Sequence, residues 1–284
     1  MSAHKIKDLA ILSGVKAHTI RIWEKRYNIL TPERTSTKIR TYDEYQLRRL
    51  LNIAILYNAG WRISKIAALA DDQLEKEVRE STETHEHQSA VVTLFVEALL
   101  ELDHIKFERL LDRRIEKEGF EQVYRHYIIP FLERIGILWV SDSIHPAQEH
   151  FISVVIRQKL IAAIDRLANS QRSSVEFVLF TPANERHEIS LLFYHYYLKK
   201  RGHNVLYLGT DVPDDSLYKV LETMQPDCLI TSLVVSRDVP ETRTYLRQLA
   251  AKYDLRVYCG GAFVEQLNLD DLDEVFHINA YVGV

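Results

Sequence analysis

The segment HTIRIWEKRYNILTPERTSTKIRTYDEYQLRRLLNI, which spans 18–53, decides the fold of the first part of the chain. Apolar residues at helical spacing predict one short helix over 5–12 and a second over 16–26, separated by Ser13-Gly14. Two short helices joined by a glycine-containing turn are typical of a helix-turn-helix, whose second helix can enter the major groove of DNA. The stretch 30–42, rich in turn residues and cations, is predicted to form a wing.

The distribution of charge along the chain indicates what kind of partner this first part could bind. The chain has 284 residues and a formal charge of −4, yet residues 1–69 hold 13 Lys and Arg against 5 Asp and Glu. Clustered cations favour a polyanion, because phosphate groups are neutralised by several of them together. Charge alone fits a solvated helical surface equally well, so the residue types have to decide.

The residue types resemble a known family. Thr19–Tyr27 (TIRIWEKRY), Pro32-Glu33-Arg34 and Arg40-Thr41-Tyr42 are similar to the winged-helix head of MerR-type transcription regulators, over about seventy residues. The resemblance implies double-stranded DNA as a partner, with phosphates held from the wing and base edges read from the second helix. It also implies at least a homodimer, and a tetramer is the alternative, because two half-sites need a two-fold partner. Trp23 is expected in the core. The residues expected to contact DNA are Lys16, Thr19, Arg21, Arg26, Tyr27, Arg34, Lys38, Arg40 and Tyr42.

The middle of the chain predicts a boundary followed by a bundle. Residues 71–88 are nearly all polar and indicate a linker or an exposed connecting helix. After them, stripes of apolar residues at three- and four-residue spacing predict a four-helix bundle over 89–170. Pro130 is expected to kink the third of these helices.

The last part, 171–284, alternates β-branched apolar runs with amphipathic helices. This pattern predicts a five-stranded parallel sheet of the Rossmann-like, flavodoxin-like kind. Ligands of such sheets bind at the carboxyl ends of the strands, where the loop 181–190 is expected. The predicted organisation is therefore a winged helix-turn-helix (1–70), a linker (71–88), a four-helix bundle (89–170) and an α/β domain (171–284).

The loop 181–190 contains Glu185-Arg186-His187, which resembles the acidic–x–His–x–x–Gly loop of cobalamin proteins. The resemblance implies that His187 is the lower axial ligand of cobalt and that Glu185 orients its imidazole. Imidazole suits a cobalt centre. Small residues at the strand ends are then expected to line a slot for the nucleotide tail of the cofactor. The further residues expected to bind the cofactor are Ser190, Leu208, Gly209, Ser232, Val234, Gly260 and Gly261.

Trp139 is followed, after nine residues, by Glu149-His150. By composition alone, Trp139 is a core aromatic and His150 a surface residue. The spacing is similar to that of light-responsive cobalamin-binding MerR regulators of the CarH and LitR types. That resemblance implies that Trp139, Glu149 and His150 cover the adenosyl group of adenosylcobalamin.

Two positions depart from the family pattern. Ser190 stands where the loop motif ends in glycine, so the backbone is expected to lose freedom and the tail slot to be tighter. Val140 stands where some relatives have a histidine that binds cobalt after photolysis. The second departure puts a bis-histidine adduct in the light state in doubt.

The predicted function is a DNA-binding repressor whose oligomerisation and DNA binding are controlled by adenosylcobalamin and light. One alternative is a cobalamin-independent regulator controlled by a protein partner such as an antirepressor. Another is a corrinoid carrier or methyltransferase subunit, in which the basic head has no role. No arrangement of a nucleophile and a base stands out in the sequence, so an enzyme is not expected. Asp211 and Asp214-Asp215 are interpreted as helix caps.

Other features concern the compartment. Cys228 and Cys259 lie in apolar runs and exclude a disulfide framework, which favours a reducing compartment. The first residues, MSAHKIKDLA, do not resemble a signal peptide, and no apolar run reaches membrane-spanning length. A cytoplasmic protein without a membrane partner is expected.

Overall fold

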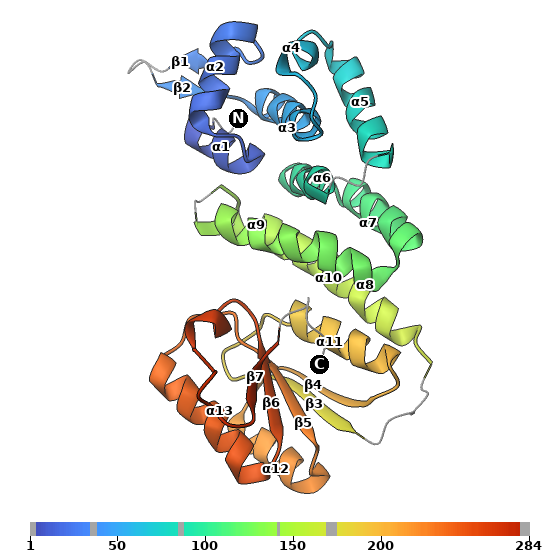
Figure 1. Ribbon diagram of the computed structural model, residues 1–284, viewed down its shortest axis with the longest axis vertical. Helices are drawn as coiled ribbons and strands as arrows, with labels where there is room; N and C mark the ends of the chain where they lie inside the picture. Colours follow the sequence, from blue (N-terminus) through green and yellow to red (C-terminus); the bar gives the residue numbers. More distant parts are fainter. Residues whose placement is uncertain (1–3, 35–38, 85–87, 141–142, 169–174, 279–284) are drawn as a thin grey trace. The chain divides into compact units, whose positions relative to one another are not determined.

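The computed structural model describes residues 4–34, 39–84, 88–140, 143–168 and 175–278. The chain forms two compact units, Met1–Ile152 and Ser153–Val284. In the described residues, the first unit is helical apart from a two-stranded ribbon, and the second contains a five-stranded sheet (Figure 1). Among the described helices, none is both long and apolar enough to cross a membrane.

The first unit begins with the predicted helix-turn-helix and wing. Helix α1 ends at Gly14, whose φ of 72° is the left-handed conformation that glycine adopts without strain. The ribbon strands pair antiparallel, with Glu33 opposite Thr41. Helix α3 begins where Asp43 accepts a hydrogen bond from the Gln46 N–H at 2.9 Å. The elements of this part are α1 (Ile6–Ser13), α2 (Ala17–Tyr27), β1 (Glu33–Arg34), β2 (Arg40–Thr41), α3 (Glu44–Asn58) and α4 (Ile63–Ile66).

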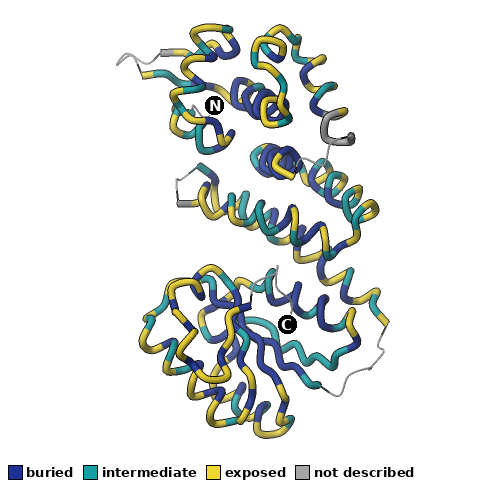
Figure 2. Tube along the Cα trace, viewed as in Figure 1, coloured by how far each residue is buried: buried dark blue, intermediate teal, exposed yellow. Residues whose placement is uncertain are grey.

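Helix α5 (Asp71–Thr84) occupies most of the stretch predicted to be a linker or a connecting helix. Its Leu74 and Val78, four residues apart, are buried, and α5 packs on α3. Helix α3 also packs on α6 (Gln88–Leu100), and both helices carry buried residues around most of their circumference (Figure 2). A helix that is apolar all round needs partners on every side. The head and the bundle helices therefore share one core, and the domain boundaries proposed from sequence stay a prediction.

The bundle packs around three phenylalanines. Phe95 of α6 lies 4.7 Å from Phe107 and 5.5 Å from Phe131, measured between ring centroids. The predicted third helix is interrupted by a π-helical turn that ends at Ile128, and Pro130 is the second residue of the α-helix that follows. Proline lacks an N–H and collides with the preceding turn, which the wider π turn accommodates. The elements here are α7 (His104–Glu118), α8 (Phe120–Val123), η1 (Tyr124–Ile128), α9 (Ile129–Val140) and α10 (Pro146–Asp165), which crosses from the first unit into the second.

The second unit confirms the predicted five-stranded parallel sheet, with the strand order β4-β3-β5-β6-β7. Helix α11 covers one face, and α12 and α13 cover the other (Figure 1). The neighbouring strands β3 and β5 lead to connections on opposite faces, so the strand order reverses between them. The elements are β3 (Glu176–Pro182), α11 (Ile189–Lys200), β4 (Asn204–Val212), α12 (Asp214–Met224), β5 (Cys228–Ser232), α13 (Val239–Tyr253), β6 (Arg256–Gly260), the 3-10 turn η2 (Val264–Gln266) and β7 (Val275–His277).

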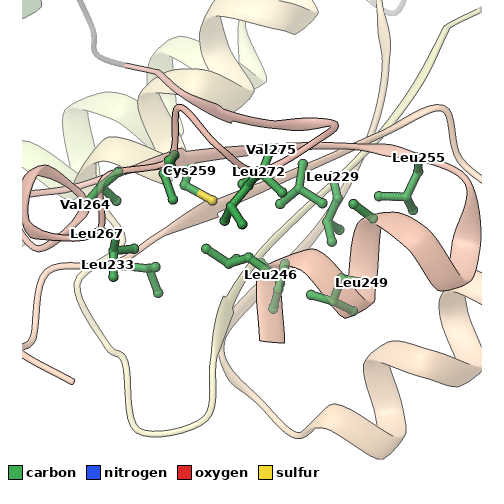
Figure 3. Close-up of a cluster of buried hydrophobic side chains, with 14 of the residues drawn as sticks. Leu229, Leu233, Leu246, Leu249, Leu255, Cys259, Val264, Leu267, Leu272 and Val275 are labelled. Carbon is green, nitrogen blue, oxygen red and sulfur yellow. The ribbon is translucent and has the colours of Figure 1, made fainter. Parts of the chain in front are cut away.

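An apolar core fixes the sheet against α12 and α13. Leu229, Cys259 and Val275 from the strands meet Leu246 and Leu249 from α13 (Figure 3). Burial raises the pKa of the Cys259 thiol, so this sulfur behaves as a small apolar side chain. The core holds the central strands in place, and the loops at their carboxyl ends are therefore built on a rigid support.

Candidate functional site

The point where the strand order reverses places two loops together. The loop 183–188 follows β3, and the loop 233–238 follows β5, its hydrogen-bonded neighbour. In open parallel sheets this switch point is where ligands bind. The loop that the sequence singled out is the first of these two.

Glu185 joins the two loops. Its side chain is 0% exposed. One carboxylate oxygen accepts the backbone N–H groups of Val234 and Val235, both at 2.8 Å. The other lies 2.7 Å from the His187 Nδ1 atom and accepts the His187 backbone N–H at 3.0 Å. The carboxylate thus binds one loop with one oxygen and the other loop with the second.

The same contacts set the charge of Glu185. Burial alone raises the pKa of this carboxyl group, but the hydrogen bonds from the His187 ring and from the backbone N–H groups outweigh it. The pKa is lowered from 4.5 to about 2. Glu185 is therefore an anion at neutral pH and accepts every one of these bonds.

An anionic acceptor at Nδ1 selects the state of the His187 imidazole. Nδ1 carries the hydrogen and donates it to Glu185, so in the neutral ring the lone pair lies on Nε2. The His187 side chain is 54% exposed. An oriented and accessible imidazole that is hydrogen-bonded to a carboxylate through Nδ1 is the arrangement found in metal-bound histidines. His187, held by Glu185, therefore has the properties that a histidine ligand of cobalt requires.

Asp211 holds the first part of the same loop, and the sequence assigned it a different role. It was expected to cap a helix, but α12 has Pro213 at its N-cap and Asp211 lies in β4. Its Oδ1 accepts the Asn184 N–H at 2.7 Å, and its own N–H donates to the Glu185 carbonyl at 3.1 Å. The cap interpretation of Asp211 is therefore wrong, because this carboxylate reaches across to a neighbouring loop.

Three further residues that the sequence did not single out brace the loop. Thr181 donates its hydroxyl to the Glu185 carbonyl at 2.6 Å. Arg237, from the loop after β5, donates to the Ala183 carbonyl at 2.9 Å. Glu188, next to His187, accepts the Tyr207 hydroxyl at 2.6 Å. Thr181 and Glu188 lie close to the Glu185–His187 motif in the sequence, and that proximity is the signal that could have found them. Arg237 lies 54 residues from its partner Ala183, so no local pattern signals its role.

Most of the other residues predicted to bind the cofactor lie at the strand ends. Ser232, Gly260 and Gly261 lie at or directly after the carboxyl ends of β5 and β6, and Val234 lies in the loop after β5. Gly261 has a φ of 101°, and a Cβ there would lie 2.3 Å from the Leu233 carbonyl oxygen. The pair Leu208-Gly209 lies earlier, inside β4, at a register irregularity between β3 and β4.

Ser190 differs from what the sequence suggested. It is the second residue of α11 and has a helical backbone, so the position requires no glycine-like freedom. Its effect comes from the side chain, because the Ser190 hydroxyl lies 2.7 Å from the hydroxyl of Ser232.

The predicted upper-face residues lie at one end of the bundle. Trp139 lies in the last turn of α9, and Glu149 and His150 lie in the first turns of α10, after the short connection 141–145. Trp139 is 46% exposed rather than a core aromatic, and His150 is exposed and pairs with Glu149 at 3.1 Å. A large aromatic ring at the surface is available to a ligand. The side chain of Val140 lies outside the described residues.

The head presents the predicted cations on α2. Arg21 and Arg26 are exposed, Lys16 is exposed at the start of the helix, and Thr19 and Tyr27 are partly exposed. Trp23 is buried against Tyr57 and belongs to the core, as expected.

The wing is tied to α2 by Glu24, a residue that the sequence did not single out. Its two carboxylate oxygens accept from Arg40 Nε at 2.9 Å and from the Tyr42 hydroxyl at 3.0 Å. Tyr42 is only 1% exposed, so its ring supports the wing from inside and is not available for the DNA contact predicted for it. Arg34 lies opposite Arg40 in the ribbon, and Lys38 lies outside the described residues.

These features define a class. A winged helix-turn-helix is joined to a helical bundle and to a parallel sheet whose switch point carries a carboxylate-backed histidine. The sequence matches the MerR HTH regulatory protein family over residues 4–73 and the B12-binding domain family over residues 91–164.

Relatives extend this match to nearly the whole chain. The chain is 30% identical over 268 residues to the HTH-type transcriptional repressor CarH of Myxococcus xanthus, covering 91% of this chain and 89% of CarH. It is 25% identical over 260 residues to the repressor CarA of the same organism, covering 90% and 86%. The chain therefore belongs to the family of MerR-type transcriptional repressors that carry a B12-binding domain. Its relatives are DNA-binding regulators rather than enzymes, and the family's cofactor is a cobalamin.

A solved structure shows the same fold beyond this family. The Methanosarcina barkeri monomethylamine corrinoid protein superposes with a TM-score of 0.55 at 12% identity, covering 65% of this chain and 91% of that protein. The likeness shows a shared bundle and sheet architecture.

Proposed function

We propose that this protein is a repressor whose oligomerisation and DNA binding are controlled by adenosylcobalamin and by light. The observation that carries the proposal is the Glu185–His187 pair, in which a buried carboxylate fixes an accessible imidazole at the sheet's switch point. The same chain carries a basic helix-turn-helix. A ligand-binding unit and a DNA-binding unit in one chain fit a ligand-controlled regulator.

The chain's own residues have separate tasks at the cofactor. His187 Nε2 would hold the cobalt, while Glu185 accepts the Nδ1 hydrogen and fixes the orientation of the ring. Trp139, Glu149 and His150 would cover the adenosyl group, as the resemblance implies. When bound, adenosylcobalamin supplies a cobalt–carbon bond that visible light breaks.

Control of DNA binding follows from linkage. A ligand shifts an assembly equilibrium only as far as it binds one state more tightly than the other. An adenosyl group that contacts the exposed Trp139 ring in one assembly state supplies such a difference. The assembled form, a dimer or a tetramer, would present two or more heads to adjacent half-sites.

The heads themselves can be tested by their salt dependence. Arg21→Ala and Arg26→Ala should each weaken binding to the operator at physiological salt. Loss of a phosphate contact lowers the slope of log affinity against log salt by about 0.9, whereas loss of a base contact lowers affinity only for the operator. Arg113→Ala, at an exposed position of α7, is the control. Unchanged operator affinity in both variants would remove α2 from the interface.

The deciding experiment combines spectroscopy and size. The purified protein is mixed with adenosylcobalamin in darkness, separated by size-exclusion chromatography, and measured by visible absorbance before and after green light. We expect retained cofactor, a spectral change on illumination and a smaller particle afterwards. His187→Ala should lose the histidine-ligated spectrum, whereas His277→Ala, at an exposed position of β7, should keep it.

Other outcomes of this experiment would indicate a different function. Retained cofactor without a change of spectrum or size would remove light from the proposal. No retained cofactor in the parent protein would leave a DNA-binding regulator whose sensor responds to a protein partner, such as an antirepressor.

A further inference from the structure

Helix α2 keeps one large apolar side chain at its surface. Its Ile20 and Trp23 are 0% and 4% exposed and belong to the core, whereas Ile22 is 43% exposed. Within α2, whose residues are all described, Ile22 is the only exposed large apolar side chain. A single exposed isoleucine is ordinary by itself, so its meaning depends on where it lies on the helix.

The neighbours of Ile22 on the helix surface are polar and basic. Residues three and four positions away lie beside a given residue on an α-helix. Toward the N-terminus these are His18, which is exposed, and Thr19, which is partly exposed. Toward the C-terminus they are Lys25 and Arg26, both exposed. Thr19 and Arg26 are predicted to contact DNA, so Ile22 lies within the face that this prediction assigns to DNA.

The wing is attached to a different side of α2. Glu24 ties the wing to the helix, because its carboxylate accepts hydrogen bonds from Arg40 and Tyr42. Two positions separate Glu24 from Ile22, which places the two side chains about 200° apart around the helix. The wing is therefore held on the side away from Ile22, and the Ile22 side chain stays accessible to a groove of DNA.

The major groove of DNA offers one group that suits an isoleucine. Among the four bases, only thymine presents a methyl group there, and the other base-edge groups are hydrogen-bond donors and acceptors. The isoleucine side chain has no hydrogen-bonding group, so it cannot recognise those donors and acceptors. It can remove a methyl group from water, and burial of apolar surface is favourable for both partners.

We propose that Ile22 specifies a thymine in the operator through apolar contact with the 5-methyl group of that base. A two-fold assembly brings one Ile22 to each half-site, so the thymine recurs at the equivalent position of both half-sites. The inference rests on the DNA-binding part of the proposed function and is independent of the cofactor.

The test removes single methyl groups from the DNA. An operator duplex is selected from randomised double-stranded DNA by the full chain in darkness, both with and without adenosylcobalamin. Each thymidine is then replaced in turn by deoxyuridine, which lacks only the 5-methyl group, and dissociation constants are measured by fluorescence anisotropy. At one position of each half-site we expect binding to weaken about 4-fold, the effect of withdrawing one methyl group from an apolar contact. Replacement in both half-sites should weaken binding about 15-fold.

Variants of the protein show whether Ile22 makes this contact. Ile22→Ala should bind the thymidine and deoxyuridine duplexes equally, and Ile22→Val should keep part of the difference. Both variants should fold as the parent does, because the substituted side chain is exposed. The matched control is Ile105→Ala, which truncates an isoleucine that is 57% exposed in the first turn of α7. It should discriminate between the two duplexes as the parent does.

Two results would overturn the inference while the proposed function stands. One is an operator in which no thymidine of either half-site is sensitive to the loss of its methyl group. The other is an Ile22→Ala variant that keeps the sensitivity of the parent. If the full chain selects no DNA under either condition, the DNA-binding part of the proposed function is wrong and the inference falls with it.

Discussion

Replacement of Glu185 by glutamine tests the centre of the site. The carboxylate accepts three backbone N–H groups and the His187 ring, and its pKa is lowered from 4.5 to about 2. One pH unit in a pKa corresponds to 1.4 kcal/mol, so the ionised carboxylate contributes about 3 kcal/mol to the free energy of unfolding at neutral pH. A glutamine keeps one acceptor oxygen and turns an NH₂ group toward donors.

The pH dependence has a defined sign. Because the folded pKa is depressed, the contribution of Glu185 is fully present above the ordinary pKa of 4.5 and is lost as the pH falls toward 2. Glu185→Gln should therefore lower the free energy of unfolding at pH 7 by about 3 kcal/mol and by progressively less as the pH approaches 2. The same variant should weaken cobalamin binding 10- to 100-fold, roughly the effect of losing a carboxylate behind a metal-bound histidine.

The assay is urea unfolding followed by far-ultraviolet circular dichroism, at several pH values from 7 down to 3. Glu265→Gln, which neutralises an exposed carboxylate in η2, is the control and should match the parent protein. Equal stability of Glu185→Gln and the parent at pH 7 would refute the reasoning, because it would mean that the bonds to this carboxylate add nothing to the fold.

Three further predictions concern other parts of the chain. Tyr42→Phe, which removes a bond to a carboxylate of α2, should lower the melting temperature by a few degrees without weakening DNA binding; a large loss of operator affinity at unchanged stability would restore Tyr42 to the interface. Burial lowers the pKa of His195 from 6.5 to about 4, so the free energy of unfolding should fall as the pH drops through that interval; a pH titration of urea unfolding should show a flatter profile for His195→Phe, and identical profiles would contradict this assignment. Gly261→Ala should destabilise the protein by several kcal/mol in calorimetry, because its Cβ would collide with the Leu233 backbone, whereas Gly136→Ala, in open space on α9, should be neutral or stabilising; equal effects would show that the backbone at Gly261 relaxes freely.

Local patterns in the sequence carry much of this architecture. Gly14 ends a helix because it adopts a positive φ, and the β-branched runs form strands buried on both faces. The Glu185-x-His187 spacing predicts a carboxylate-backed imidazole because both residues belong to one loop. Local features such as these can be predicted from the sequence because the interacting groups are neighbours along the chain.

Contacts between distant segments were decided only by the tertiary structure. From the sequence, Asp211 is interpreted as a helix cap. In the fold, β4 pairs with β3, and this pairing brings the Asp211 carboxylate to the Asn184 N–H. Tyr42 is predicted from the sequence to contact DNA, but packing in the fold buries it beneath the wing. From the sequence, Ser190 is expected to restrict the backbone. In the fold it has ordinary helical geometry, and its hydroxyl lies next to that of Ser232. The sequence by itself determined which elements form and which residues carry the chemistry, because those depend on local propensity and spacing. The fold decided which of them support one another, since those bonds join residues that only the packing of helices and strands brings together.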